Sequence, residues 1–214
     1  MVVDEAADHV YAVNINPEAQ TVNVKLRPYH HGDLRAALIS AGLSLLSTRT
    51  ANDLSLREVA RAVGVTANAV YRHFPDKRSL MEALAAEGLH ALAAAQQEAA
   101  EAAGGGAAGF DATGAAYVRF ALAKPALFRL IFSNPTPIDR LREPTGSSDA
   151  AMALLRANTA RLAPPDGDAR VMALQSWSLA HGLAMLMLDS QVPADDADID
   201  LVFANWTRLL RGER

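Results

Sequence analysis

The chain has 214 residues, a length that suits one large domain or two small ones. Hydrophobic residues make up 50% and charged residues 21%, a composition that excludes a disordered chain. The sequence contains no cysteine, which excludes disulfides, thiolate metal sites and cysteine nucleophiles. The formal net charge of −4 argues against a nucleic-acid partner for the chain taken as a whole.

The charge is, however, distributed unevenly. Residues 1–24 hold four acidic residues and no Lys or Arg, and residues 91–214 hold eleven basic and fourteen acidic residues. Residues 25–90 hold nine basic and six acidic residues, so this stretch alone carries a positive charge. Any contact with nucleic acid is therefore expected in residues 25–90.

Residues 1–24 are predicted to be an N-terminal extension. Two stretches rich in β-branched residues, 10–15 and 21–26, flank a turn signal at Asn16-Pro17, which would suit a small hairpin. A mobile tail is the favoured prediction, because an isolated hairpin is marginally stable in water. The acidic start lacks the basic and apolar regions of a signal peptide, so a cytoplasmic protein is expected.

From His30 onward, apolar residues recur every three or four positions, which predicts an all-α fold. Ser55 and Glu58 have the spacing of a capping box, and Thr66 and Asp76 are good N-caps for the next two helices. The predicted fold is an N-terminal helix-turn-helix domain, residues 25–76, followed by a larger helical domain, residues 77–214. About nine helices are expected, near residues 30–47, 55–63, 67–73, 77–103, 110–123, 125–132, 149–162, 168–189 and 196–211.

Residues 56–74 have the pattern of a helix-turn-helix. Ala60 is small where the two helices would cross, and Gly64 lies in the turn, where a positive φ is needed. The tight turn would hold the second helix so that it can enter the major groove of DNA. The predicted DNA contacts are Arg27, Tyr29, Arg57, Thr66, Ala67, Asn68, Tyr71, His73 and Lys77.

These residues have different expected roles. Asn68 carries an amide that can read adenine, and Thr66 lies at a helix N-terminus, where a phosphate can bind. Lys77 opposes the dipole of its own helix, which a phosphate partner would explain. Each residue also has an ordinary alternative, such as packing for Tyr71 or a solvated surface position for Lys77.

Four segments of this half carry a family resemblance: Tyr29–Arg35, Leu54–Ala60, Gly64–Thr66 and Val70–Lys77. Together they resemble the N-terminal domain of TetR-family transcriptional regulators. The resemblance implies a dimeric, all-helical repressor. Its first three helices and the start of the fourth would bind operator DNA, and the remainder would bind a small effector and dimerise.

The second half carries a further resemblance. Tyr117–Ala121, Pro125–Phe132 and Trp177–Gly182 are similar to the TetR subgroup whose C-terminal domain is named for a Trp-His-Gly signature. The predicted effector pocket is lined by Leu92, Phe110, Tyr117, Phe120, Phe128, Phe132, Trp177 and His181. Ordinary core packing is the alternative for each aromatic residue, and His181 fits a hydrogen-bonded core histidine as well as a ligand contact. Since few charges fall among them, an apolar or aromatic effector is expected.

The last two predicted helices are too apolar for a monomer of this size to cover. They are expected to pair with their symmetry mates in a four-helix bundle. The predicted dimer interface comprises Leu174, Met185, Leu188, Val202, Phe203, Trp206 and Leu210. The uncharged stretch 171–188 contains several polar residues, so a core or interface helix is favoured over a membrane span.

Other functions receive less support. Residues 104–109 match the dinucleotide fingerprint G-x-G-x-x-G, but the preceding sequence predicts a helix where a strand is needed, so a linker is expected. No G-x-S-x-G, H-E-x-x-H or Walker A motif occurs, so no enzyme, cofactor or metal is predicted. Two alternatives stay open: a helical DNA-binding protein without an effector, and a hydrolase centred on His181.

Overall fold

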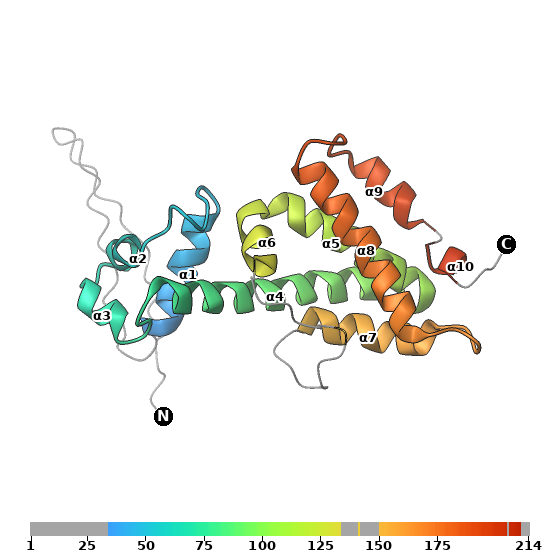
Figure 1. Cartoon of the computed structure of the whole chain (residues 1–214), viewed down its shortest axis with the longest axis horizontal. Coiled ribbons are helices and arrows are strands. Elements are labelled where there is room, and N and C mark those ends of the chain that lie inside the picture. The colour runs from blue at the N-terminus through green and yellow to red at the C-terminus, as the bar shows by residue number, and fades with distance from the viewer. Residues whose placement is uncertain (1–33, 134–140, 142–149, 205, 211–214) are drawn as a thin grey trace, which may run out of the picture. The chain divides into compact units, whose positions relative to one another are not determined.

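The computed structural model of the chain describes residues 34–133, 141, 150–204 and 206–210. The chain divides into residues 1–32 and residues 33–214, and all described residues lie in the second unit. They form ten α-helices and no strand, which confirms the all-α prediction (Figure 1). The hairpin considered for residues 10–26 lies outside the described residues. The helices are α1 (Leu34–Leu46), α2 (Leu56–Val63), α3 (Ala67–Tyr71), α4 (Lys77–Ala102), α5 (Gly106–Ala123), α6 (Pro125–Phe132), α7 (Ala150–Leu162), α8 (Ala169–Leu188), α9 (Asp196–Phe203) and α10 (Trp206–Leu210).

The first three helices pack around a small apolar core of their own. Leu38 of α1, Val59 of α2 and Val70 of α3 are fully buried, and Phe74 closes this core from the segment before α4. Arg35 lies over the Phe74 ring, with its guanidinium carbon 5.3 Å from the ring centroid. The residues around α2 and α3 are therefore held by side chains close to them in sequence.

Local capping fixes both ends of α2. The Ser55 hydroxyl accepts a hydrogen bond from the Glu58 amide, and the Glu58 carboxylate accepts one from the Ser55 amide, which confirms the predicted capping box. At the other end Gly64 adopts a left-handed conformation with a φ of 79°, as the turn requires. The sequence signals at both ends of α2 are thus confirmed.

The long helix α4 connects this first group of helices to the rest of the fold. Asp76 caps it by accepting a hydrogen bond from the Ser79 amide at 2.7 Å. Near its N-terminus α4 packs against α1, and further along it packs against α5, α6 and α7 (Figure 1). A movement of α4 would therefore change the packing in both parts of the fold.

Helix α5 is the central helix of the second part and packs against α4, α8, α9 and α10. A Cβ atom at Gly114 would lie 2.3 Å from the Phe203 ring, so only glycine lets α9 approach this closely. Arg119 of α5 binds Asp196 and Asp200 of α9, each at 2.7 Å. Both contacts fix α9 on α5.

Two predicted boundaries differ from the structure. The last helix is interrupted after Phe203, so α9 and α10 replace the single helix expected for residues 196–211. Helix α5 begins at Gly106, earlier than predicted, so the linker after α4 is shorter than residues 104–109. Because α4 precedes these glycines, the strand that a dinucleotide site requires is absent here.

One described helix, α8, is long and apolar enough to cross a membrane by length and composition alone. It packs against α5 and α7, and it carries Gln175, Ser176, Ser178 and His181. These contacts and polar residues favour a helix that packs against protein over one that spans a bilayer.

Candidate functional site

The turn between α2 and α3 has the geometry of a helix-turn-helix. The Val65 amide donates to the Ala60 carbonyl at 2.9 Å, and the Gly64 amide donates to the Arg61 carbonyl at 3.2 Å. These two bonds close the turn and direct the chain into α3. Thr66 caps α3, since its hydroxyl accepts a hydrogen bond from the Ala69 amide.

The outer side of α3 carries the predicted reading residues. Asn68 is exposed, Tyr71 is 45% exposed, and His73 just beyond the helix is exposed as well. Thr66 is also exposed, and Ala67 is half-buried. A polar face of this kind next to a buried Val70 is the arrangement that a helix needs in order to dock in a groove.

Exposed cations surround this face. Arg57 and Arg61 on α2 and Arg72 at the end of α3 are exposed and form no ion pair within the described part of the chain. Sequence reasoning did not include Arg61, although it lies one turn beyond Arg57 on the same helix. Arg27 and Tyr29, also predicted to contact DNA, lie outside the described residues.

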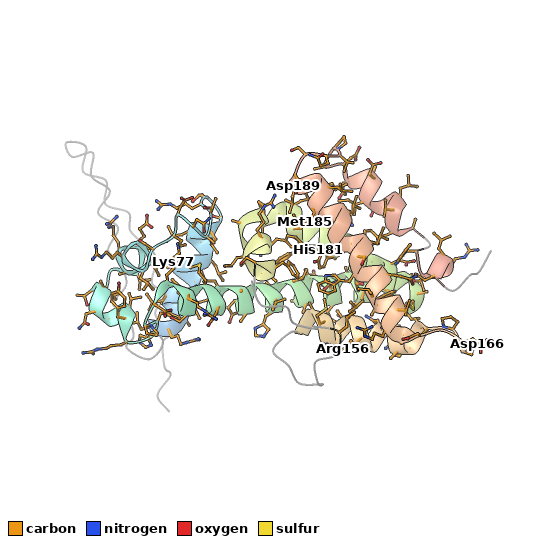
Figure 2. All side chains as sticks on the ribbon, viewed as in Figure 1. Lys77, Arg156, Asp166, His181, Met185 and Asp189 are labelled. Atoms are coloured by element: carbon orange, nitrogen blue, oxygen red, sulfur yellow. The ribbon has the colours of Figure 1, made fainter. Side chains whose placement is uncertain are left out.

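Lys77 has a partner within the chain. Its ammonium donates to the Asn52 carbonyl at 2.7 Å and so ties the start of α4 to the loop before α2. Figure 2 labels Lys77. This bond gives a structural reason for a cation in the first turn of α4. Two donors of the ammonium stay free, because lysine has three, and the residue is exposed.

A small cavity lies among the helices of the second part. Its volume, taken as the space open to the centres of water molecules, is about 30 Å³. Its lining comes from α4, α5, α7, α8, α9 and α10: Gln96, Phe110, Thr113, Gly114, Tyr117, Ala151, Met152, Leu155, Ser176, Trp177, Ala180, Phe203 and Trp206. Of the eight residues predicted for the pocket, Phe110, Tyr117 and Trp177 belong to this lining.

The other five predicted residues do not line this cavity. Leu92 and Phe128 are fully buried in the core, and Phe120 is buried with the Lys124 ammonium 5.3 Å from its ring centroid. Phe132 and His181 pack beside the cavity within an aromatic cluster. Aromatic residues at helical spacing suit a core as well as a pocket, so the sequence alone does not distinguish the two.

The aromatic cluster has a polar centre at Tyr117. The Tyr117 hydroxyl lies 2.8 Å from His181 Nδ1 and accepts a hydrogen bond from Trp177 Nε1 at 3.3 Å. Burial lowers the pKa of His181, which favours the neutral imidazole and suits Nδ1 as an acceptor for the Tyr117 proton. Figure 2 marks His181 on α8. His181 is therefore a hydrogen-bonded histidine within the cluster, one of the two readings that the sequence allowed.

Phe128 and Phe132 of α6 complete this cluster. The His181 ring is stacked on Phe128, with ring centroids 5.5 Å apart, and meets Phe132 edge-on at 5.0 Å. The cluster therefore connects α8 and α5 to α6 directly.

Helix α10 forms one wall of the cavity and is held by hydrogen bonds from Trp206 and Thr207. Trp206 donates from Nε1 to the Ser176 hydroxyl at 3.3 Å. The Thr207 amide and hydroxyl both contact Asp111 Oδ1 at 2.7 Å. Partial burial raises the pKa of the Asp111 carboxyl, although these two bonds act in the opposite direction.

The predicted dimer residues divide into two groups. Leu174 is 46% exposed, and Met185, Leu188, Val202 and Leu210 are half-buried. Phe203 and Trp206 have contacts within the protomer: Phe203 is 3% exposed and packs on Gly114, and Trp206 lines the cavity. The dimer interface itself stays a prediction. The sequence pattern showed that α9 and α10 are apolar but not which of their faces turn inward.

Both halves of the chain match family models. Residues 38–84 match the family described as bacterial regulatory proteins, tetR family, and residues 110–210 match the tetracyclin repressor-like C-terminal domain. None of the curated proteins matches the sequence.

Solved structures share the fold. A protein of unknown function from Rhodococcus sp. RHA1 is 31% identical, with a TM-score of 0.67, and the alignment covers 87% of this chain and 98% of that one. A TetR-family transcriptional regulator from Streptomyces coelicolor is 22% identical, with a TM-score of 0.60, covering 82% and 79%. A TetR variant from Acinetobacter baumannii AYE in complex with minocycline is 19% identical, with a TM-score of 0.54, covering 82% and 97%.

The fold and the α2–α3 unit define a helix-turn-helix protein with a helical second domain. Together with the two matched family models, they identify the chain as a member of the TetR family of transcriptional regulators. This is a family of DNA-binding regulators and not of enzymes, so the hydrolase alternative centred on His181 is set aside.

Proposed function

We propose that this protein is a ligand-responsive transcriptional repressor that leaves its operator when a small effector binds. The observation that carries the proposal is the exposed face of the α2–α3 unit. There Asn68 lies among arginines that have no acidic partner in the described part of the chain. A cation held without a partner on a capped helix-turn-helix suits a phosphate backbone.

Residues 25–76 would form the DNA-binding domain and residues 77–214 the effector-binding and dimerisation domain. Asn68 would read a base edge, with adenine as the best match for its amide. The hydroxyl of Thr66, already an acceptor in the α3 cap, keeps its proton free for a phosphate oxygen. Contacts to the DNA backbone would come from Arg57, Lys77, Tyr71 and His73. Ala67 would touch a thymine methyl group, and Arg27 would reach the backbone or the minor groove. Tyr29 is the remaining predicted contact.

The unit formed by α1 to α3 and the start of α4, called the head below, would have to bind the operator in two copies. Two heads require a homodimer, and α8 offers a surface for it. Val171, Leu174, Ser178, Gly182 and Leu186 lie along one stripe of this helix at spacings of three and four residues. The three apolar residues are each about half exposed in the protomer, and a Cβ at Gly182 would meet no atom within 4 Å. Small residues at the middle of an apolar stripe allow two helices to approach closely. We infer that α8 and its symmetry mate form the centre of a four-helix bundle.

The effector would act through α4. This helix begins at Lys77, which is bound to the loop before α2, and it carries Gln96 into the lining of the cavity. A ligand that enlarges the cavity would tilt α4 and move the heads away from operator spacing, about 34–36 Å for one DNA turn. The described residues that line the cavity carry no charge, which favours an apolar or aromatic effector. A relative of the same fold was crystallised with minocycline, which agrees with a small-molecule effector.

We further propose a cytoplasmic location and membership of the Trp-His-Gly subgroup. The subgroup assignment is supported by the hydrogen bonds of Trp177 and His181 to one hydroxyl, that of Tyr117.

The test is binding of the full chain to a labelled DNA fragment from upstream of its own gene, followed by fluorescence anisotropy. We expect saturable binding at low salt. The logarithm of the binding constant should fall linearly with the logarithm of the salt concentration, since phosphate contacts release counterions. Absence of binding at low salt, or binding that ignores salt, would contradict the proposed function.

A further inference from the structure

Gln96, one of the residues that line the cavity, carries a hydrogen-bond acceptor that the described part of the chain does not satisfy. Gln96 donates from Nε2 to the Thr113 carbonyl at 3.2 Å. Its other amide atom, Oε1, is buried and has no hydrogen-bond partner within the described part of the chain. A buried acceptor without a partner destabilises a fold, so each such atom calls for an explanation.

The orientation of this amide is fixed by its neighbour. The Thr113 carbonyl can only accept, so the atom that faces it must be the amide nitrogen. The Thr113 hydroxyl cannot complete the amide, since it donates its proton to the Phe110 carbonyl at 2.6 Å. The unsatisfied atom is therefore the carbonyl oxygen, and what it lacks is a donor.

The lining also restricts the charge of a ligand. Among the described residues that line the cavity there is no Asp, Glu, Lys, Arg or His. An ionic ligand would lose its hydration here without meeting an opposite charge, which is strongly unfavourable. The remaining surface is mostly aliphatic and aromatic, so a neutral and mainly apolar molecule fits best.

The size of the cavity limits the ligand further. About 30 Å³ for water centres is far below the several hundred Å³ of a drug-sized site, so a ligand must open the cavity. The wall formed by Trp206 belongs to the short helix α10, which Ser176 and Asp111 hold in place. Movement of α10 would enlarge the space beside Gln96 without changing the core of α4 and α5.

We propose that this cavity binds a compact, neutral, mainly apolar molecule that carries one O–H or N–H group, and that Gln96 Oε1 is the acceptor that selects for this group. The inference rests on the proposed function only in taking the cavity as the effector site. It adds to that function the chemical class of the effector and the residue that recognises it.

The chain contains a built-in reporter for the test. Its two tryptophans, Trp177 and Trp206, both line the cavity, so their fluorescence reports on occupancy directly. The full chain is titrated with cyclohexanol and with methoxycyclohexane, which has a similar shape but no donor. We expect cyclohexanol to bind at least about fivefold more tightly, the factor typical of one hydrogen bond.

Two variants assign the preference to a residue. In Gln96→Leu the acceptor is removed, and the preference for the alcohol should disappear. Gln97→Leu is the matched control, since Gln97 is exposed on the same helix and donates to Glu101. It should keep the preference of the unchanged chain, and circular dichroism establishes that both variants fold.

Three results would overturn the inference: equal binding of the two probes to the unchanged chain, a preference that persists in Gln96→Leu, or no fluorescence change with either probe up to its solubility. The comparison on the unchanged chain does not depend on any variant folding. A chain that prefers the alcohol but does not bind promoter DNA would uphold the role of Gln96 and reject the proposed function. A chain that binds promoter DNA but binds the two probes equally would uphold the proposed function and reject the role of Gln96.

Discussion

The helix-turn-helix head, formed by α1 to α3 and the start of α4, and the cavity of the second part are built in opposite ways. The head is made from short helices whose caps, turn and core residues lie within some forty positions of one another, from Leu38 to Leu80. The cavity is assembled from six helices that span the chain from Gln96 to Trp206. Local signals therefore define the head, whereas long-range packing defines the cavity. This difference also separates their roles, because a rigid reading surface and a site that opens have different needs.

The largest effect is expected from a substitution that breaks the dimer, because the proposed dimer interface lies in the second part whereas DNA binding depends on the head. Gly182→Arg places a long cation on the exposed stripe of α8, where the protomer itself has open space. We expect monomers in analytical ultracentrifugation and a loss of DNA affinity of about 100-fold or more, since two linked heads bind far better than one. Ala160→Arg on the exposed side of α7 is the control and should remain dimeric. A dimeric Gly182→Arg variant would show that α8 is not the interface.

The next effect concerns the stability of the head alone. Phe74→Ala removes a ring that is 2% exposed and should lower the free energy of unfolding by about 3–5 kcal/mol. Tyr71→Ala, which removes a ring that is 45% exposed, should change it by less than about 0.5 kcal/mol while weakening DNA binding. Chemical denaturation measures both values. Equal destabilisation by the two variants would mean that the head has no core of its own around Phe74.

Within the head, base reading and backbone anchoring should be separable. Asn68→Ala should cost about 1–3 kcal/mol at one base position of the operator and leave other sequences unaffected. Arg57→Ala should weaken all sequences alike and reduce the salt slope by about one. Arg57 is preferred over Lys77 here because Lys77 also holds the Asn52 carbonyl. Identical behaviour of the two variants in competition binding would contradict the division of roles.

A smaller effect tests the turn itself. The Cβ of alanine in Gly64→Ala would meet no atom within 4 Å. The expected loss of about 1–2 kcal/mol in the free energy of unfolding therefore comes only from the left-handed backbone. Gly64→Asn should recover part of that loss, because asparagine tolerates this conformation better. Thermal unfolding compares the two variants. A harmless alanine at this position would argue against the left-handed turn.

The smallest expected effect is on the pH dependence of stability, and it tests the environment of His181 in the second part of the fold. Burial lowers the pKa of His181 below its ordinary value near 6.5, so the unfolded chain binds more protons than the folded one as the pH falls through that value. Stability should therefore decrease as the pH falls below about 6.5, by a small amount because the ring is only half-buried. In His181→Gln this part of the decrease should be absent. An unchanged pH dependence in the variant would assign the decrease to other histidines.

Much of the head could be predicted from the sequence. Ser55 and Glu58, Gly64, Thr66 and Asp76 each act through atoms within three or four residues, and all of them have the predicted local roles. The role of Lys77 was less accessible, because its partner, Asn52, is 25 residues away in a loop.

The cavity could be predicted only in part. Phe110, Tyr117 and Trp177 of the predicted effector pocket line the cavity, whereas Leu92 and Phe128 are buried in the core, since an apolar helix does not reveal which of its sides faces a void. The role of the cavity as the effector pocket stays a prediction. Gln96 was overlooked because a glutamine in an alanine-rich helix usually faces solvent. Phe203 was assigned to the dimer interface because the close approach permitted by Gly114, 89 residues earlier, leaves no local signal.

The most direct test of the central claim is a hydroxyl-radical footprint of the full chain on DNA from upstream of its own gene. A dimer that reads DNA through α3 of each protomer predicts two protected half-sites on one face of the duplex. Their centres should be about one helical turn apart, roughly 34–36 Å. A single protected patch, or protection that does not depend on Asn68, would contradict the account.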